Sequence, residues 1–121
     1  MNSLKRFNET VIDILRELQH MLHDTDFRFY KQTAKTIVVL NKNAMYNVFK
    51  EHINNHIPKM LNKDESLFTL EEFAYLMNDQ FYEKVIRKCE QTWKLLNTKQ
   101  KEIIWLYLHL LVLFHQQIQM I

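Results

Sequence analysis

Glycine is absent from this chain of 121 residues. At an average usage of ~7%, roughly eight glycines are expected in a chain of this length, and glycine is the residue that most readily adopts a positive φ angle. Phosphate-binding loops, dinucleotide-binding fingerprints, nucleophile elbows, calcium-binding loops and tight hairpins depend on it for that reason. The sequence therefore excludes the standard form of each of these sites.

Proline and cysteine occur once each, as Pro58 and Cys89. A single cysteine excludes a disulfide within the chain and a zinc site made of several cysteines. Residues 1–7 contain no apolar stretch of the kind that a signal peptide needs. We therefore expect the protein to reside in a reducing compartment and not to be secreted.

What the sequence does contain is apolar spacing typical of α-helices. Apolar residues recur at steps of three and four in the stretches 4–22, 27–38, 45–57, 73–77 and 82–96. Residues 35–40 are rich in β-branched side chains and could form a strand, but no partner strand is apparent, so we predict a helix. Pro58 is expected to disturb the third stretch, because proline lacks a backbone donor.

Polar residues that favour helix caps separate these stretches. Ser3 is a candidate cap for the first helix, and the second is expected to begin through Asp26. Thr69 and Glu72 have the spacing of a capping box, which predicts a short helix from Thr69 onward. Asn97, followed by a threonine, is expected to cap the last helix.

The last helix is apolar on every side from 103 to 114, except at His109. Such a helix belongs either at the centre of a bundle or in lipid. Twelve residues span about 18 Å at ~1.5 Å per residue, which is short of the ~30 Å hydrocarbon layer. Extension to the end of the chain adds a histidine and three glutamines. We therefore predict a core or interface helix in preference to a membrane anchor.

These patterns together predict an all-α, single-domain bundle over residues 1–121. We expect five or six helices, with the 103–114 helix at or near the centre.

The histidines are candidates for chemistry because they fall in three pairs: His20 with His23, His52 with His56, and His109 with His115. The spacing of the first two pairs brings two imidazoles onto one helix face, as metal binding requires. However, no carboxylate lies between the second pair, where a helical zinc-protease motif needs one. We predict no catalytic, metal or cofactor site and a protein that is not an enzyme, with a metal-dependent hydrolase as an alternative that metal analysis would test.

Charge is distributed in blocks, although the formal net charge is only +2. Residues 27–63 contain seven bases and one acid, and residues 64–83 contain six acids and no base. Arg28, Lys31 and Lys35 fall on one face of the predicted second helix, an arrangement suited to phosphate binding. The acidic block would repel a nucleic-acid backbone, and the blocks can also attract each other within the fold or across an interface.

The order of aromatic and aliphatic residues resembles small helical proteins encoded by large nucleocytoplasmic DNA viruses of algae and protists. The resemblance rests on Phe7-Asn8, Phe49-Lys50 with Ile53, Pro58 followed by Met60, Asp64-Glu65 before Leu67-Phe68, and the closing stretch 104–108. It implies a setting in a virion or in a viral factory of the host cytoplasm. It implies no catalytic or binding residue.

We therefore predict a non-enzymatic protein–protein interaction function, as a minor capsid or core component of a virus or as an adaptor for host proteins. The partner would be another protein or further copies of this chain. Trp93, Trp105 and Tyr107 are the candidate interface residues, although each also suits a core. The alternative is a nucleic-acid-binding accessory protein that uses Arg28, Lys31 and Lys35.

Overall fold

A computed structural model describes residues 2–120. This part of the chain contains six α-helices: α1 (Ser3–Leu22), α2 (Thr25–Leu40), α3 (Ala44–Val48), α4 (Ile57–Leu61), α5 (Gln80–Leu95) and α6 (Thr98–Gln119). Shorter helical turns join them: the π-helical η1 (Phe49–Ile53) and the 3₁₀-helical η2 (Asn54–His56), η3 (Glu65–Phe68) and η4 (Glu71–Leu76). The predicted all-α bundle is confirmed, and residues 35–40 are helical.

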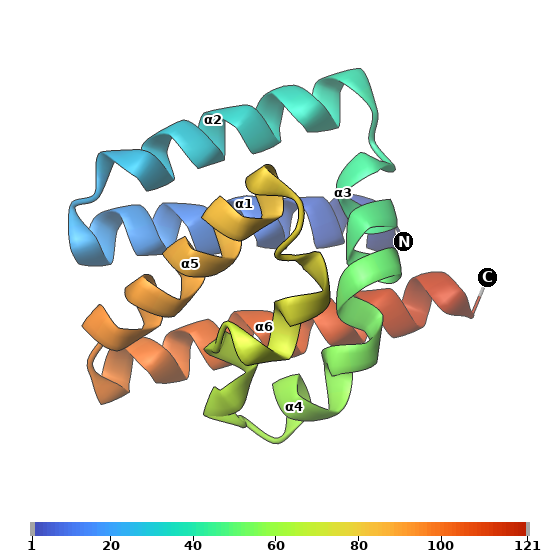
Figure 1. The fold of residues 1–121 in the computed structure, drawn as a ribbon. Coiled ribbons are helices and arrows are strands. Elements are labelled where there is room, and N and C mark those ends of the chain that lie inside the picture. Colours follow the sequence, from blue (N-terminus) through green and yellow to red (C-terminus); the bar gives the residue numbers. More distant parts are fainter. Residues whose placement is uncertain (1, 121) are drawn as a thin grey trace.

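Helix α1 lies in the middle of the bundle, packed between α2 and α6 (Figure 1). The segment from α3 to α4 runs down one end of these helices, and α5 returns in front of them. Helix α4 packs on α6, whereas α5 packs mainly on η3 and η4. This arrangement leaves α2 as an outer layer that is held chiefly by α1.

Aromatic rings fill two regions of the core. Phe7 on α1 meets the rings of Tyr46 and Phe49 edge to face, at centroid distances of 5.2 and 5.1 Å. In the second region the Trp93 ring stacks on Phe68 at 4.0 Å and meets Trp105 at 5.1 Å. Such pairs add to the stabilisation from area burial.

The helix caps are mostly asparagine and aspartate side chains. Asn97 forms a capping box with Gln100 at the start of α6, which confirms it as the cap of that helix. The first two caps differ from the prediction: Asn2, not Ser3, caps α1, and Asp24, not Asp26, caps α2. In each case the helix begins earlier than expected, since an acceptor side chain stood one or two residues before the predicted cap.

The predicted capping box at Thr69 and Glu72 is wrong. Thr69 follows η3 and its hydroxyl donates to the carbonyl of Ser66 at 2.7 Å. The Glu72 carboxylate accepts from Lys59 and His56 instead of reaching back to a backbone amide. Only the 3₁₀ turn η4 forms here, because both side chains of the expected box have other partners.

The predicted helix over 45–57 is broken into pieces. The chain changes from α-helix to a π turn and then a 3₁₀ turn before α4, in which Pro58 occupies the first turn. Proline is tolerated there because its missing donor would have no partner in a helix. The disturbance expected around Pro58 is therefore present, and it begins before the proline.

Helix α6 supplies six buried residues, more than any other described helix. One of these six residues is Val112, which is 1% exposed. No helix within residues 2–120 is long and apolar enough to cross a membrane. The packing of α6 on α1 and α4 instead accounts for its apolar character on most sides.

Candidate functional site

The three residues singled out as interface candidates lie in different environments. Trp93 and Trp105 are 7% and 3% exposed and belong to the aromatic core. Tyr107 is partly exposed, and partial burial raises the pKa of its hydroxyl. Neither tryptophan is presented on the surface of the described chain, so a partner would contact other side chains first.

The outward face of α6 carries leucines that sequence reasoning did not single out. Leu106 and Leu113 are 61% and 45% exposed, and Leu110 between them is partly exposed. Steps of four and three residues place the three on one helix face. We call these residues the α6 stripe.

Polar residues flank the α6 stripe along the same face. Glu102, one turn before Leu106, forms an ion pair with Lys63 at 2.8 Å. Gln116, one turn after Leu113, is exposed. Because the polar residues before and after an apolar stretch mark which side faces water, their spacing could have located the stripe from the sequence.

Helix α4 borders the α6 stripe. The Nε2 atom of His109 lies 2.9 Å from the carbonyl oxygen of Met60, which holds α4 against α6. Leu61, the next residue, is 46% exposed. The stripe therefore lies beside another exposed leucine that a partner could also cover.

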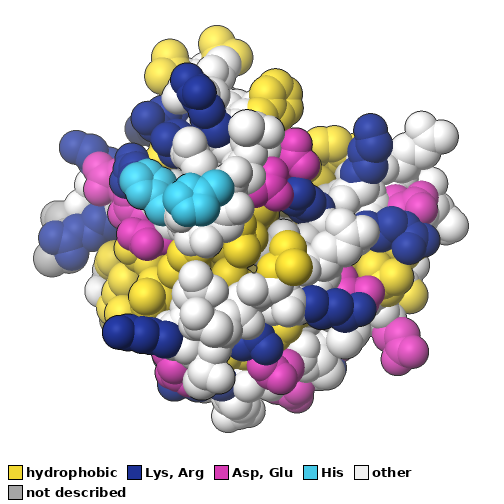
Figure 2. Space-filling view, turned by 90° about the vertical axis from the view of Figure 1, so that its left-hand side faces the viewer, with side chains coloured by type: hydrophobic (Ala, Val, Ile, Leu, Met, Phe, Trp, Pro, Cys, Tyr) yellow, Lys and Arg dark blue, Asp and Glu magenta, His cyan; other side chains and the backbone are white. Residues whose placement is uncertain are grey.

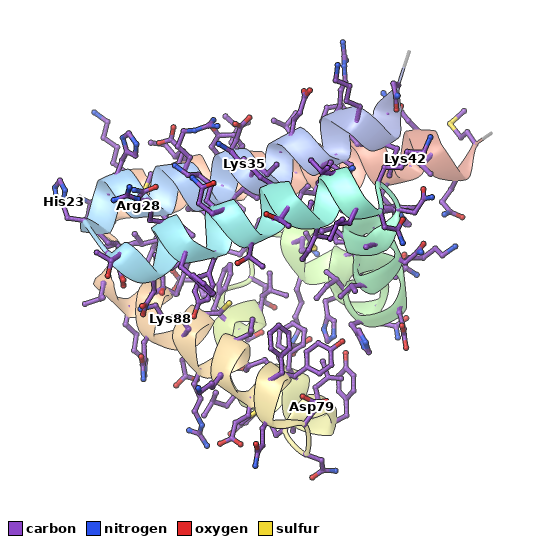
Figure 3. All side chains as sticks on the ribbon, turned by 90° about the horizontal axis from the view of Figure 1, so that it is seen from above. His23, Arg28, Lys35, Lys42, Asp79 and Lys88 are labelled. Atoms are coloured by element: carbon purple, nitrogen blue, oxygen red, sulfur yellow. The ribbon has the colours of Figure 1, made fainter. Side chains whose placement is uncertain are left out.

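Arg28, Lys31 and Lys35 lie on α2, the outer helix of the bundle. Figure 3 shows Arg28, Lys35 and Lys42 following this side of the molecule, away from Asp79. None of the first three forms an ion pair within residues 2–120. Partial burial lowers the pKa of Lys31, and the neighbouring charges, of which Lys35 is the first, lower it further.

The corner between α1 and α2 gathers side chains of several kinds (Figure 2). His20 and His23 are exposed there, and His23 takes the left-handed conformation with φ at 52°. Nearby, Lys88 of α5 donates to Asp24 at 2.7 Å and to Asp26 at 2.9 Å. Asp24 and Asp26, which are close to the histidines in sequence, are thus held by a lysine.

The second histidine pair forms a polar cluster between η1, η2 and η4. His56 Nδ1 lies 2.7 Å from the Glu72 carboxylate, and its Nε2 lies 2.9 Å from the Tyr75 hydroxyl. That hydroxyl also lies 2.9 Å from the carbonyl oxygen of His52. The hydroxyl has one proton, so it donates either to this carbonyl or to His56 Nε2. Both ring nitrogens of His56 therefore have a partner within the cluster.

Glu72 is the charged centre of this cluster. Its hydrogen bond with Lys59 is the main cause that holds the carboxyl pKa below its ordinary value, and the bond with His56 acts in the same direction. The same contact raises the pKa of Lys59. We interpret the cluster as a structural brace that ties η4 to η2 and α4.

His115 is buried at the other end of the bundle. Its Nδ1 lies 2.8 Å from the Tyr46 hydroxyl, which in turn accepts from Gln119 at 2.7 Å. Desolvation lowers the pKa of His115. Within residues 2–120, no group of three or more histidine, cysteine, aspartate or glutamate side chains could hold a metal ion.

Comparison with known proteins gives no relative: no family model, curated protein or solved structure matches this chain.

Proposed function

We propose that this chain is a non-enzymatic protein–protein interaction module and that the α6 stripe is its contact surface. The observation that carries the proposal is the exposure of Leu106 and Leu113 on a helix whose other sides are buried in the core. An apolar patch bordered by polar residues is the usual form of an association site.

The partner that the α6 stripe fits is a second copy of the same helix in antiparallel orientation. Leu106 and Leu113 are equidistant in sequence from the point between His109 and Leu110. A two-fold axis at that point places Leu106 of one copy opposite Leu113 of the other. Glu102 then faces a glutamine, so no like charges meet, and the opposed helix dipoles attract.

The stripe is narrow compared with stable interfaces, which bury ~800 Å² on each partner. We therefore expect weak self-association, with a dissociation constant in the micromolar range or higher. This corresponds to a binding free energy of ~8 kcal/mol or less. Leu61 and the polar flanks of the stripe would form the rim of the contact.

Sedimentation equilibrium tests the proposal. The wild type is expected to self-associate, and Leu106→Lys is expected to be monomeric with an unchanged circular dichroism spectrum. Leu40→Lys is the matched control, because Leu40 is 81% exposed but lies on α2. A wild type that stays monomeric up to millimolar concentration, or a Leu106→Lys variant that associates like the control, would contradict the proposal.

A second candidate function is phosphate or nucleic-acid binding by α2. It is supported by the clustering of Arg28, Lys31 and Lys35 without ion-pair partners in residues 2–120. Filter binding should then weaken steeply with salt, and changing all three residues to Gln should abolish it. Changing Lys50, Lys84 and Lys99 to Gln removes the same charge elsewhere and should preserve most of the binding. No binding at low salt would eliminate this candidate.

The resemblance to proteins of large DNA viruses supports a hypothesis about the setting. In that setting the module would be a minor capsid or core component, or an adaptor for host proteins in the viral factory of the cytoplasm. Mass spectrometry of purified virus particles tests the first option, since a structural component must be found in them.

A further inference from the structure

A cavity of about 310 Å³ lies between α5 on one side and α3 with η1 on the other. Its inner wall consists of core residues, among them Met60, Leu67 and Leu111, which are 2%, 5% and 5% exposed. Val48 and Val85 line it as well and are 46% and 37% exposed. The cavity therefore leads from the surface into the hydrophobic core and is separate from the α6 stripe.

The lining of this cavity is almost entirely apolar. Of its sixteen lining residues, twelve carry only hydrocarbon or thioether side chains. The remaining four are His52, Thr69, Tyr82 and Cys89. Water in such a space would find few hydrogen-bond partners, whereas an apolar molecule would replace it favourably.

The π-helical turn η1 forms one wall. It supplies Phe49, His52 and Ile53 to the lining. π-helical turns are rare and occur frequently at functional sites. Here the turn directs three side chains toward the same space, which is a second observation that points to a binding site at this place.

One pair of polar atoms marks where a ligand could form a hydrogen bond. His52 Nε2 lies 3.2 Å from the Tyr82 hydroxyl across the cavity wall. The His52 ring is also near the Glu51 carboxylate, at 3.7 Å. A negatively charged ligand group beside His52 would meet that carboxylate, so an uncharged hydroxyl or carbonyl fits better.

The environment of Cys89 also disfavours charge. The Cys89 residue lines the cavity and is exposed to solvent. Protein atoms nevertheless surround the thiol, and the resulting desolvation raises its pKa to about 11. An ionised ligand group placed among the same atoms would experience the same penalty.

The volume sets the size of the ligand. A cavity of ~150 Å³ in an apolar core accommodates benzene, and this one is about twice as large. We propose that the cavity binds an uncharged, mainly hydrocarbon molecule of roughly ten to twelve non-hydrogen atoms that carries one hydroxyl or carbonyl group. That group bonds to His52 or Tyr82, and the hydrocarbon part contacts the inner wall.

The test compares 1-decanol with decanoate, which has the same chain length but carries a charge. Decanol should raise the melting temperature in a concentration-dependent manner, and it should slow the alkylation of Cys89 by iodoacetamide. Decanoate should bind at least about tenfold more weakly. No protection of Cys89 by decanol, or equal affinity for the two compounds, would overturn the proposal.

Val85→Trp places a large ring in the cavity and should weaken decanol binding about tenfold or more. Leu95→Trp is the control, because Leu95 is on the same helix, is 68% exposed and does not line the cavity. If Val85→Trp does not fold, Val48→Phe on the opposite wall serves the same purpose. A cavity-filling variant that binds decanol like the control would overturn the proposal.

Ligand binding in the cavity can be tested separately from the proposed self-association through the α6 stripe. The Leu106→Lys variant should bind decanol like the wild type, because residue 106 is not among the lining residues. Protection of Cys89 that increases with protein concentration in the absence of decanol would mean that a second copy covers the cavity. That outcome would overturn the ligand proposal.

Discussion

Cys89 provides the most direct prediction about this molecule, because it is the single thiol of the chain. Desolvation by the cavity wall raises its pKa from 9.0 to about 11. The thiolate is the reactive form of cysteine. We therefore expect the folded protein to react with iodoacetamide more slowly than the chain unfolded in urea, with a different dependence on pH.

The size of the effect follows from two opposing factors. A pKa higher by about two units lowers the thiolate fraction about 100-fold at pH values below both pKa values. A more basic thiolate is also a better nucleophile, with a Brønsted coefficient of ~0.4–0.5, which returns a factor of roughly six to ten. The net expectation is about a tenfold slower reaction at pH 8, and steric hindrance by the cavity would add to it.

The assay is alkylation followed by mass spectrometry between pH 7 and pH 10.5, with circular dichroism at each pH to show that the protein is folded. The rate for the folded protein should still increase nearly tenfold between pH 9 and pH 10, whereas that for the unfolded chain should level above pH 9. A folded-state rate that levels at or below pH 9 would refute the argument, because the cavity would then not desolvate the thiol.

Three further predictions concern stability. Trp105→Ala should lower the free energy of unfolding by ~3–5 kcal/mol, since this ring is 3% exposed and packs on Trp93, and Tyr107→Ala should cost clearly less in the same urea titration; equal losses would contradict the placement of the two rings. Lys88 lowers the pKa of Asp24, so its stabilisation is present above the ordinary carboxyl pKa and is lost as the pH falls through the lowered folded value. Urea titrations of wild type and Lys88→Met should therefore differ at pH 6 and converge in acid, and a constant difference would argue against the ion pair. Burial, and to a smaller extent Lys50, lowers the pKa of His115, so its contribution is present above the ordinary histidine pKa and is lost as the pH falls through the folded value. The variant His115→Phe should show a smaller loss of stability between pH 7 and pH 5, and an unchanged slope would mean that another group titrates.

The long helices could be predicted from the sequence because their information is local. In α1, α2 and α5 the apolar residues recur with the period of the helix and the polar residues between helices serve as caps. Residues 35–40 are helical as predicted, because α2 extends to Leu40. Asn97 could be identified as a cap because its partner Gln100 is three residues away.

The segment between α2 and α5 could not be predicted in detail, because distant side chains decide its structure. Glu72 binds Lys59, thirteen residues earlier, and the backbone amide of Leu70 donates to Glu90, twenty residues later. Local spacing contains no information about such partners. The capping-box rule therefore failed at Thr69, although the two residue types were those that the rule requires.

The α6 stripe was hidden for a different reason. Within the apolar stretch 103–114 only His109 is polar, so the outward face is indicated only by polar residues beyond its ends, Glu102 and Gln116. Tryptophans attract attention as interface anchors because they are enriched at hot spots, but here their size fills the core instead. The packing of α1 and α4 on α6 identifies Leu106 and Leu113 as the exposed side chains.

From Ala44 to Leu61 the chain passes from an α-helix through a π turn and a 3₁₀ turn to another α-helix. The packing of this segment therefore depends more on its length than on its exact side chains. Each inserted or deleted residue turns all later side chains by ~100° around the helix axis. Phe49 and Met60, which are 7% and 2% exposed, must both face the core across this path. The chain passes through the π turn and the 3₁₀ turn between these two residues, so an insertion or deletion there would turn one of them away from the core. Evolution can therefore exchange side chains along this segment more freely than it can change the number of residues in it.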